Sequence, residues 1–302
     1  MGSFQRLLGE ALAPGRVCVH EPMSRHTTFR VGGPADYYVE PGTKEELAAV
    51  FAICRQNGIP YYILGNGSNL LVSDKGYRGV MVSLGKHWSG IRVDGPRIWA
   101  GAGALLSCVA RAALKNSRKG MEFASGIPGS VGGAVAMNAG AYGSEMADVL
   151  ESVAALTPGG EERRLAVGEL ELGYRTSCIA GRGYVALEAA FILEPGEPEA
   201  IREKMEELSR KRKSKQPLEY PSAGSTFKRP LGHFAGKLIE DAGLRGFCVG
   251  GAQVSEKHCG FVVNRGGATA ADIYELCRRV RQRVWEHSGV ELELEVKVLG
   301  DF

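Results

Sequence analysis

Two glycine-rich segments of the sequence could bind a phosphate-bearing ligand. Residues 65–70 read GNGSNL, and residues 126–143 read GIPGSVGGAVAMNAGAYG, without a single charged side chain. Glycine loses much conformational freedom on folding, so such segments are expected where another group must lie close to the main chain. Backbone N–H groups, with serine and asparagine side chains, can hold a pyrophosphate without a fixed charge. Neither segment is a GxGxxG or Walker loop, and each alone could equally be a turn or a close-packed alanine–glycine segment.

The composition is that of a globular protein without a strong charge. The chain has 302 residues, of which 44% are hydrophobic, with a formal net charge of +3 and 42 glycines. This length allows two or three domains, and the charge argues against a polyelectrolyte or a disordered chain. The seven cysteines form no CxxC pair, so we expect buried thiols in a reducing compartment and no disulfide framework or metal site. We find no signal peptide or membrane-spanning run and therefore expect a cytoplasmic protein.

The order of helices, strands and glycine turns predicts an α+β protein. Thr43 begins a capping box, TKEE, and Gly58 ends the helix that follows it. Pro217 and Pro221 break the chain after a charged helix, and we place a domain boundary there. Helices are expected at residues 43–58, 104–116, 197–215, 236–242 and 269–289, and strands at residues 61–64, 80–84, 91–93, 98–100, 153–157, 184–193, 261–263 and 290–299.

Seven segments, in order along nearly the whole chain, resemble one family of flavoenzymes. They are HTTFRVGGPAD (26–36), LGNGSNLLVSD (64–74), GIPGSVGGAVAMNAGAYG (126–143), LGYRTS (172–177), PSAGSTFKRP (221–230), GGAQVSEKHCGFVVN (250–264) and LELEVKVLG (292–300). In this combination the chain resembles the UDP-N-acetylenolpyruvoylglucosamine reductases of bacterial peptidoglycan precursor synthesis. The resemblance implies a two-domain FAD-binding fold of the vanillyl-alcohol-oxidase (PCMH) type and a C-terminal α+β substrate-binding domain.

The resemblance also implies the domain bounds. We expect a first FAD-binding subdomain at residues 1–84, a second at 85–208 and a substrate-binding domain at 209–295, with residues 296–302 returning to the first. Some family members insert a loop whose tyrosine closes over the substrate. No room for a long insertion exists between Gly232 and Asn264, so this chain resembles the shorter type.

The reaction implied by the resemblance has two halves. NADPH reduces a non-covalently bound FAD, and after NADP leaves, UDP-N-acetylenolpyruvoylglucosamine enters the same site. Hydride passes from flavin N5 to C3 of the enolpyruvyl group, so negative charge develops on C2 and the carboxylate, and UDP-N-acetylmuramate is formed. Such chemistry needs positive charge or donors at the carboxylate and an acid that protonates C2.

Three residues match the family's catalytic residues. Arg175 would stabilise the enolate, since an arginine fork suits a carboxylate and keeps its charge. Ser225 would donate the proton, which requires neighbours that polarise its hydroxyl group. Glu295 matches the active-site glutamate. By type and spacing alone, these residues could instead be a surface arginine after a turn, a turn serine and part of a solvated strand face.

The two glycine segments are assigned by the resemblance to FAD, around its pyrophosphate and isoalloxazine. The residues expected to contact FAD are Gly65, Asn66, Gly67, Ser68, Asn69, Leu70, Ile127, Pro128, Gly129, Ser130, Gly133, Ala134, Asn138, Ala139 and Gly140. For the diphosphate and uridine, matching motifs suggest Lys228, Gln253, Lys257 and Asn264.

The remaining partner classes follow from what the sequence lacks. The run RKRKSK at residues 210–215 could suggest nucleic acid, but it is the only such run and ends a helix. We therefore expect a solvated helix end near the substrate entrance, with no nucleic-acid partner and no membrane insertion. The sequence is compatible with a monomer and does not indicate the oligomeric state. The alternatives are a different FAD-dependent oxidoreductase of the same fold and a non-enzymatic binder of a sugar nucleotide or of nucleic acid.

Overall fold

A computed structural model describes residues 2–302 and divides them into two compact units. Unit 1 comprises the chain up to Val19, Tyr37–Asn66 and Gly79–Lys211, and unit 2 comprises His20–Asp36, Gly67–Arg78 and Arg212–Phe302. The α+β class and the FAD-binding fold predicted from the sequence are confirmed, as the comparisons below also show. The predicted division into three domains remains a prediction.

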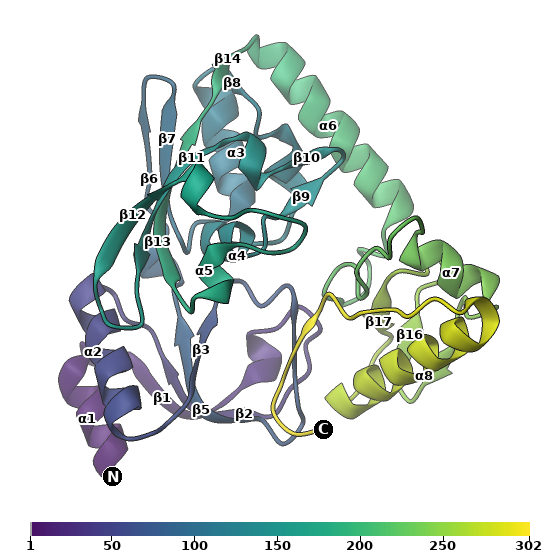
Figure 1. The fold of residues 1–302 in the computed structure, drawn as a ribbon, viewed down its shortest axis with the longest axis horizontal. Helices are drawn as coiled ribbons and strands as arrows, with labels where there is room; N and C mark the ends of the chain where they lie inside the picture. Colours follow the sequence, from purple (N-terminus) through teal and green to yellow (C-terminus); the bar gives the residue numbers. More distant parts are fainter. Residues whose placement is uncertain (1) are drawn as a thin grey trace. The chain divides into compact units, whose positions relative to one another are not determined.

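Unit 1 is built around a five-stranded antiparallel sheet with the order β12-β11-β13-β7-β6 (Figure 1). The strands are β6 (Ile91–Asp94), β7 (Arg97–Gly101), β11 (Leu150–Leu156), β12 (Glu162–Ala166) and β13 (Val185–Ile192). Helices α3 (Leu106–Lys115), α4 (Val131–Ala136) and α5 (Cys178–Gly181) pack against this sheet. Burial alternates along β7, whereas β11 and β13 at the centre of the sheet are buried along most of their length, so both of their faces are covered.

A four-stranded sheet, β1-β2-β5-β3, contains the points at which the chain passes between the units. Its strands are β1 (Val17–Pro22), β2 (Pro34–Val39), β3 (Tyr61–Leu64) and β5 (Tyr77–Ser83), and β3 pairs with β5 in parallel. Helices α1 (Ser3–Ala11) and α2 (Lys44–Gln56) bury Phe4, Leu8 and Phe51 in the hydrophobic core that also contains the buried residues of the five-stranded sheet. The remaining short elements of this part of the chain are β8 (Arg118–Lys119), β9 (Gly140–Ala141), β10 (Ser144–Glu145), β14 (Glu194–Pro195), and the 3₁₀ turns Lys86–Trp88, Glu122–Gly126, Met146–Asp148 and Val167–Glu169.

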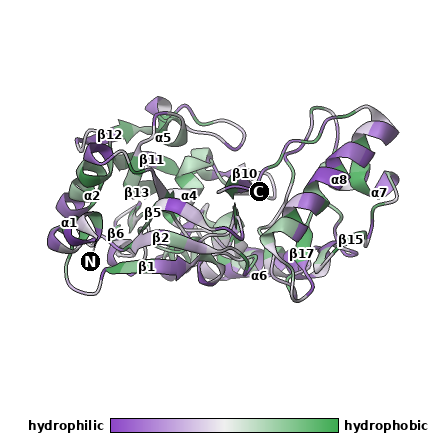
Figure 2. Cartoon of the chain, turned by 90° about the horizontal axis from the view of Figure 1, so that it is seen from below, coloured by the Kyte–Doolittle hydropathy of each residue, from purple (hydrophilic) through white to green (hydrophobic). Residues whose placement is uncertain are grey.

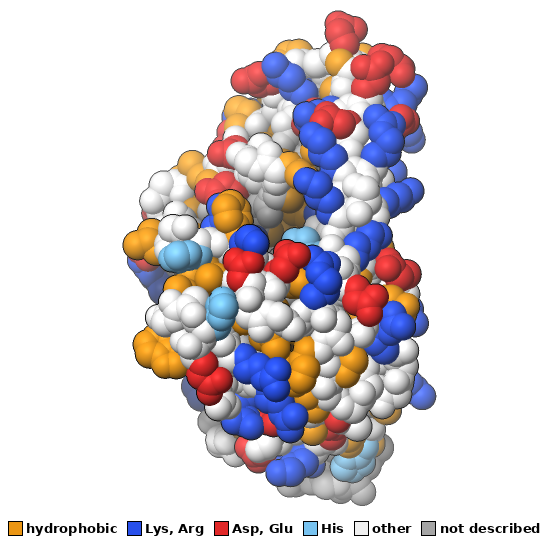
Figure 3. All heavy atoms as spheres, turned by 90° about the vertical axis from the view of Figure 1, so that its right-hand side faces the viewer, with side chains coloured by type: hydrophobic (Ala, Val, Ile, Leu, Met, Phe, Trp, Pro, Cys, Tyr) orange, Lys and Arg blue, Asp and Glu red, His pale blue; other side chains and the backbone are white. Residues whose placement is uncertain are grey.

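Helix α6 (Pro198–Lys215) carries the charged run that the sequence analysis singled out. It buries only Ile201 and Leu208. Its basic side chains pair with acidic ones within the helix, as for Arg202 with Glu199 and Lys211 with Glu207. Basic and acidic groups accordingly alternate on the molecular face drawn in Figure 3. This mixture of signs is typical of a solvated helix.

In unit 2, helix α8 packs against the three-stranded antiparallel sheet β15-β16-β17, and helix α7 packs against α8. Helix α8 (Ala270–Ser288) begins with a capping box between Thr269 and Asp272 and ends at Gly289, whose φ of 66° only glycine adopts readily. Helix α8 is amphipathic, with hydrophilic and hydrophobic residues alternating along its ribbon in Figure 2, and its buried side includes Ile273 and Val280. The other elements are α7 (Ala235–Asp241), β4 (Leu70–Val72), β15 (Cys248–Val249), β16 (Ala252–Val254), β17 (Val262–Asn264), β18 (Lys297–Leu299) and a 3₁₀ turn at Met23–Arg25.

The predicted ten-residue strand at residues 290–299 is wrong. Only β18 forms a ladder, and it pairs in parallel with β4. Leu294 forms an isolated bridge with Phe227 before the segment reaches β4. Burial still alternates, with Leu292 buried and Glu293 exposed, but the pairing partner changes along the segment and interrupts the ladder. The pattern therefore predicted the extended conformation correctly and the continuous strand incorrectly.

The sequence predicts neither a disulfide framework nor a membrane-spanning helix. Within residues 2–302, every cysteine is a free thiol. The prediction of buried thiols holds for Cys54, Cys178, Cys259 and Cys277 and is wrong for Cys18 and Cys248, which are exposed. No helix of these residues is long and apolar enough to cross a membrane.

Asp74 is predicted to stabilise unit 2 through α8. Its carboxylate accepts hydrogen bonds from the N–H groups of Ala270 (2.9 Å) and Ala271 (2.8 Å) in the first turn. Since a carboxylate satisfies donors at a helix N-terminus and interacts favourably with the helix dipole, Asp74→Ala should lower the free energy of unfolding by about 1 kcal/mol. Urea denaturation followed by circular dichroism measures this, with Asp94→Ala at the exposed end of β6 as control. Equal stability of the two variants would contradict the role of Asp74.

Candidate functional site

The two glycine segments meet within unit 1. Asn66 donates from Nδ2 to the carbonyl of Pro128 at 2.7 Å. Gly65 lies so close to Ser130 that an added Cβ would be 2.6 Å from Oγ. The sequence analysis placed these residues in one site, and the structure brings them together.

The second segment is anchored by its own main chain. Val131 and Gly132 donate to the carbonyls of Ala104 and Ala102, both at 2.8 Å, and a Cβ at Gly132 would lie 2.9 Å from the Cβ of Ala102. Ser130 begins helix α4, and its Oγ accepts from the N–H of Gly133 at 3.4 Å. These contacts explain the bare backbone, because side chains would prevent the two main chains from approaching.

Several main-chain donors of the two segments have no partner within residues 2–302. They are the N–H groups of Gly65, Asn66, Gly129 and Ser130. Unpaired N–H groups on glycine-rich backbone are the kind of donors that bind a pyrophosphate. The residues present therefore fit the FAD that the sequence predicts, and they could hold it through backbone donors.

The rest of the first segment belongs to unit 2. Gly67 has φ of 60°, and an added Cβ would lie 1.8 Å from the carbonyl oxygen of His26, so only glycine fits there. Its own carbonyl accepts from the N–H of Thr28 at 3.1 Å. Ser68 and Asn69 follow, and Leu70 begins β4. The six residues predicted as one FAD loop are thus divided between the units.

The end of the second segment is held by Asn138 rather than by its glycines. The Asn138 side chain is completely buried and donates from Nδ2 to the carbonyl of Gly173 at 3.2 Å. Its Oδ1 accepts from the N–H of Ala147 at 3.0 Å. Ala139 donates to Ala134, and Gly140 begins β9. Both polar groups of Asn138 thus bind protein atoms, which the sequence did not indicate.

Arg175 lies at the tip of a tight turn in unit 1. Gly173 and Thr176 pair across the turn by hydrogen bonds of 3.1 and 3.2 Å. Arg175 has φ of 57°, a left-handed conformation that costs a residue with a Cβ about 1–2 kcal/mol. Its guanidinium is half-buried and lies 5.0 Å from the ring of Tyr174. A strained backbone under a cationic side chain is typical of a functional position.

Ser225 and Glu295 lie on adjacent extended segments of unit 2. The N–H of Glu295 donates to the carbonyl of Thr226, the residue after Ser225, at 2.9 Å. On the other side, Asn69 donates from Nδ2 to the carbonyl of Glu295 at 3.0 Å. Thr226 is buried and its Oγ1 accepts from Val262 N–H at 2.9 Å, whereas Ser225 is exposed and Glu295 half-buried. Two of the three predicted catalytic residues are therefore neighbours.

The four predicted substrate ligands are all bonded within unit 2. Lys228 forms an ion pair with Glu293, and Gln253 donates to the carbonyl of Gly246 at 3.2 Å. Lys257 donates to the carbonyl of Lys213 at 2.7 Å. Asn264 is buried and donates to Phe29 at 3.1 Å, which joins β17 to the HTTF motif. Their contacts with substrate remain predictions.

His258, next to Lys257, is a histidine whose pKa is shifted by its surroundings. Burial of the ring lowers its pKa below the usual value, and Arg245 and Lys215 act in the same direction. Its Nδ1 accepts from the N–H of Gly260 at 3.1 Å. His258 is therefore neutral near pH 7 and can serve as a hydrogen-bond partner rather than as a cation.

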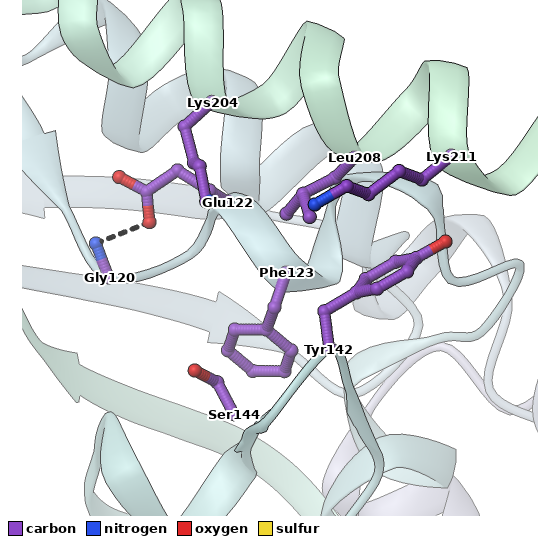
Figure 4. Close-up of a pocket in the computed structure, with 8 residues that line it drawn as sticks. All are labelled: Gly120, Glu122, Phe123, Tyr142, Ser144, Lys204, Leu208 and Lys211. Carbon is purple, nitrogen blue, oxygen red and sulfur yellow. Dashed lines mark hydrogen bonds between the residues drawn. The ribbon is translucent and has the colours of Figure 1, made fainter.

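A pocket of about 270 Å³ in unit 1 was not indicated by the sequence analysis. Figure 4 shows Lys204, Leu208 and Lys211 of α6 facing Tyr142 and Phe123 across it. The remaining lining residues are Gly120, Glu122 and Ser144. The spacing of the three α6 residues, four and three apart, is the signal that places them on one helix face.

The charge of this pocket is largely balanced. Glu207 accepts a hydrogen bond from Lys204 at 2.8 Å and pairs with Lys211. These lysines, Lys204 first, lower the pKa of Glu207 to about 2. The exposed ring of Tyr142 is then the most prominent group for contact with a ligand.

Comparison with known proteins agrees with this arrangement. Residues 35–166 match the model of an FAD binding domain, and residues 216–299 match that of the UDP-N-acetylenolpyruvoylglucosamine reductase C-terminal domain. The chain is 52% identical to the UDP-N-acetylenolpyruvoylglucosamine reductase of Clostridium perfringens over 297 residues, covering 98% of this chain and 97% of the relative. The chain belongs to the UDP-N-acetylenolpyruvoylglucosamine reductase family.

Other relatives of this reductase family agree over the same length. The reductase of Caldanaerobacter subterraneus subsp. tengcongensis is 52% identical, covering 97% of each chain. The crystal structure of the Thermus caldophilus reductase superposes with a TM-score of 0.81 at 39% identity, covering 94% of this chain and 98% of that one. Phl p 4.0202, a glucose dehydrogenase, has a TM-score of 0.50 at 16% identity, with 65% of this chain and 45% of that one covered, and shares only the fold.

Gly65→Ala is predicted to weaken FAD binding. The new methyl group would displace Ser130 Oγ from its bond with Gly133 and fill the space beside the unpaired N–H groups. We expect the dissociation constant for FAD to rise by at least about tenfold, measured by fluorescence titration of the apoprotein. Gly168→Ala is the matched control, because a Cβ there meets nothing within 4 Å. Unchanged affinity in Gly65→Ala would contradict the assignment.

Proposed function

We propose that the chain reduces UDP-N-acetylenolpyruvoylglucosamine to UDP-N-acetylmuramate with NADPH, through FAD, in peptidoglycan precursor synthesis. Membership of the reductase family supports this function. The observation that carries it lies in unit 1, where Gly65 and Asn66 meet the second glycine segment and N–H groups of both are unpaired, which fits a flavin pyrophosphate. When bound, FAD would supply the redox chemistry by which hydride from NADPH reaches C3 of the enolpyruvyl group.

Arg175 is proposed to bind the carboxylate on which charge develops. A guanidinium offers parallel N–H donors that match both carboxylate oxygens and keeps its charge at any working pH. Charge that forms during the reaction is stabilised best by a donor already held in position. The strained turn beneath Arg175 supports such preorganisation.

Ser225 and Glu295 are proposed to complete the reaction at C2. Ser225 donates the proton to the enolate carbon, and Glu295 polarises the acid or orients the substrate beside it. Their adjacent segments, joined by the bond between Glu295 and Thr226, support a shared role. The exposed hydroxyl group of Ser225 is accessible to a ligand.

The remaining features of the proposal concern partners and location. NADPH and the sugar nucleotide use one site in turn, so each should compete with the other. Lys228, Gln253, Lys257 and Asn264 are proposed to contact the nucleotide end of the substrate. A cytoplasmic location completes the proposal.

The proposed function is tested with the purified holoprotein. We expect absorbance near about 450 nm from bound FAD. NADPH oxidation should depend on added UDP-N-acetylenolpyruvoylglucosamine. NADPH loss that needs only oxygen would indicate another oxidoreductase of this fold. A folded but colourless protein that cannot take up FAD would indicate a binding protein.

Arg175 variants should separate strain from chemistry. Arg175→Gly accepts the left-handed backbone, so the free energy of unfolding should stay within about 1 kcal/mol of wild type. Turnover should fall by about 10²–10³, the usual effect of removing a donor that stabilises developing charge. Arg175→Lys keeps a positive charge without the fork and should also slow reoxidation of FAD by substrate. Unimpaired turnover of Arg175→Lys would refute the bidentate contact.

Ser225→Ala should block only the second half-reaction. Loss of a general acid lowers the rate by about 10²–10⁴, so reoxidation of reduced FAD by substrate should fall within that range. Reduction of FAD by NADPH should remain within about twofold of wild type, since no proton is delivered to C2 in that step. Stopped-flow absorbance measures both rates, with Ser222→Ala of the same segment as control. Equal losses in both half-reactions would show that Ser225 is not the proton donor.

A further inference from the structure

We propose that Asn138 and Ser177 are positioning residues that together hold the Arg175 turn in its reactive geometry. This inference rests on the proposed function, because it concerns the arginine that binds the carboxylate. We call the two side chains the turn clamp.

The turn clamp binds both flanks of the turn to the second glycine segment. Before the tip, Asn138 donates from Nδ2 to the carbonyl of Gly173 at 3.2 Å. After the tip, Ser177 donates from Oγ to the carbonyl of Ala136 at 2.9 Å. Ala136 and Asn138 are two residues apart, so both flanks are fixed to the same short piece of chain that follows α4.

Both clamp side chains are shielded from water. Asn138 is 0% exposed and Ser177 is 3% exposed. A buried donor or acceptor that loses its partner is not compensated by solvent, so these bonds resist breaking. Asn138 also uses its second polar group, because Oδ1 accepts from Ala147 N–H at 3.0 Å and thereby fixes the orientation of the amide.

The backbone conformations show why the turn requires such support. Arg175 and Asn138 have φ of 57° and 41°, both in the left-handed region. Asparagine tolerates this region, whereas arginine is disfavoured there. Without external bonds, the turn could relax to an ordinary conformation and move the guanidinium. The clamp ties that conformation to the segment predicted to bind FAD, so cofactor loop and arginine share one rigid frame.

The clamp predicts a selective kinetic defect. Displacement of a catalytic group by about 1 Å can cost about 100-fold in rate. Asn138→Asp preserves shape, left-handed tolerance and the acceptor for Ala147, but its carboxylate faces the Gly173 carbonyl and cannot donate. Both polar groups of the Asn138 side chain bind protein atoms, so its predicted contact with FAD falls to the backbone, which this substitution keeps. We expect reoxidation of FAD by substrate to slow about 100-fold, with reduction by NADPH within about twofold of wild type. Ser177→Ala should slow the same step by about five- to tenfold, as expected for one neutral hydrogen bond.

A pH profile separates positioning from a general loss of structure. Burial raises the pKa of a carboxyl group, and a protonated carboxyl can donate to Gly173 again. The rate of FAD reoxidation in Asn138→Asp, divided by the wild-type rate at the same pH, should therefore rise as the pH is lowered from about 8 to about 6. Thr157→Ala is the control for destabilisation. Thr157 is buried in a turn of unit 1, where its Oγ1 accepts from the N–H of Glu161 at 3.1 Å. This variant should affect neither half-reaction.

The outcomes are distinguishable. If UDP-N-acetylenolpyruvoylglucosamine does not reoxidise the reduced FAD of the wild-type protein, the proposed function is wrong, and so is the role of the turn clamp. If the wild-type protein is reoxidised by substrate, two results would overturn the turn clamp alone. Either both clamp variants react at wild-type rates, or they lose the same factor in both half-reactions. If Asn138→Asp does not fold, Ser177→Ala decides by the same comparison of half-reactions.

Discussion

The close approach of main chains around the glycine segments is the constraint on which the candidate site depends. Val131 and Gly132 bond to the carbonyls of Ala104 and Ala102, and Gly65 lies against Ser130. These contacts leave no room for side chains, and N–H groups of the same segments remain unpaired. The sheet of unit 1 and helices α3 and α4 keep these segments in place. A ligand held by backbone dipoles needs no nearby charge, so the charged side chains remain available for the substrate.

The same principle explains the polar side chains buried nearby. Asn138 and Ser177 would be costly in the core if they lacked partners, yet each bonds to a main-chain carbonyl. Their bonds offset the strain of Arg175, whose left-handed backbone a local sequence would not choose. Strain at a position carrying a functional side chain, supported by buried polar contacts, is a common arrangement in enzyme sites.

In unit 2 a single extended segment organises the other half of the chemistry. The segment around Glu295 lies between Thr226 and Asn69, and β18 then pairs with β4. Residues more than two hundred positions apart in sequence are thereby brought together. The buried Thr226 fixes this arrangement through Val262, while the adjacent Ser225 stays exposed. The exposed and buried roles of two neighbouring residues follow from the alternation of an extended chain.

The sequence by itself determined the family, the fold class, most helices and the glycine segments, because capping boxes, apolar periodicity and glycine positions are local signals. It also singled out Arg175, Ser225 and Glu295, although only through the family motifs. The tertiary structure decided that residues 290–299 are not one strand, that Asn138 turns toward Gly173, and that the residues from Gly65 to Leu70 are divided between two units. These features depend on partners far away in the chain, and no local pattern specifies which carbonyl a buried amide will meet or where a ladder changes its partner.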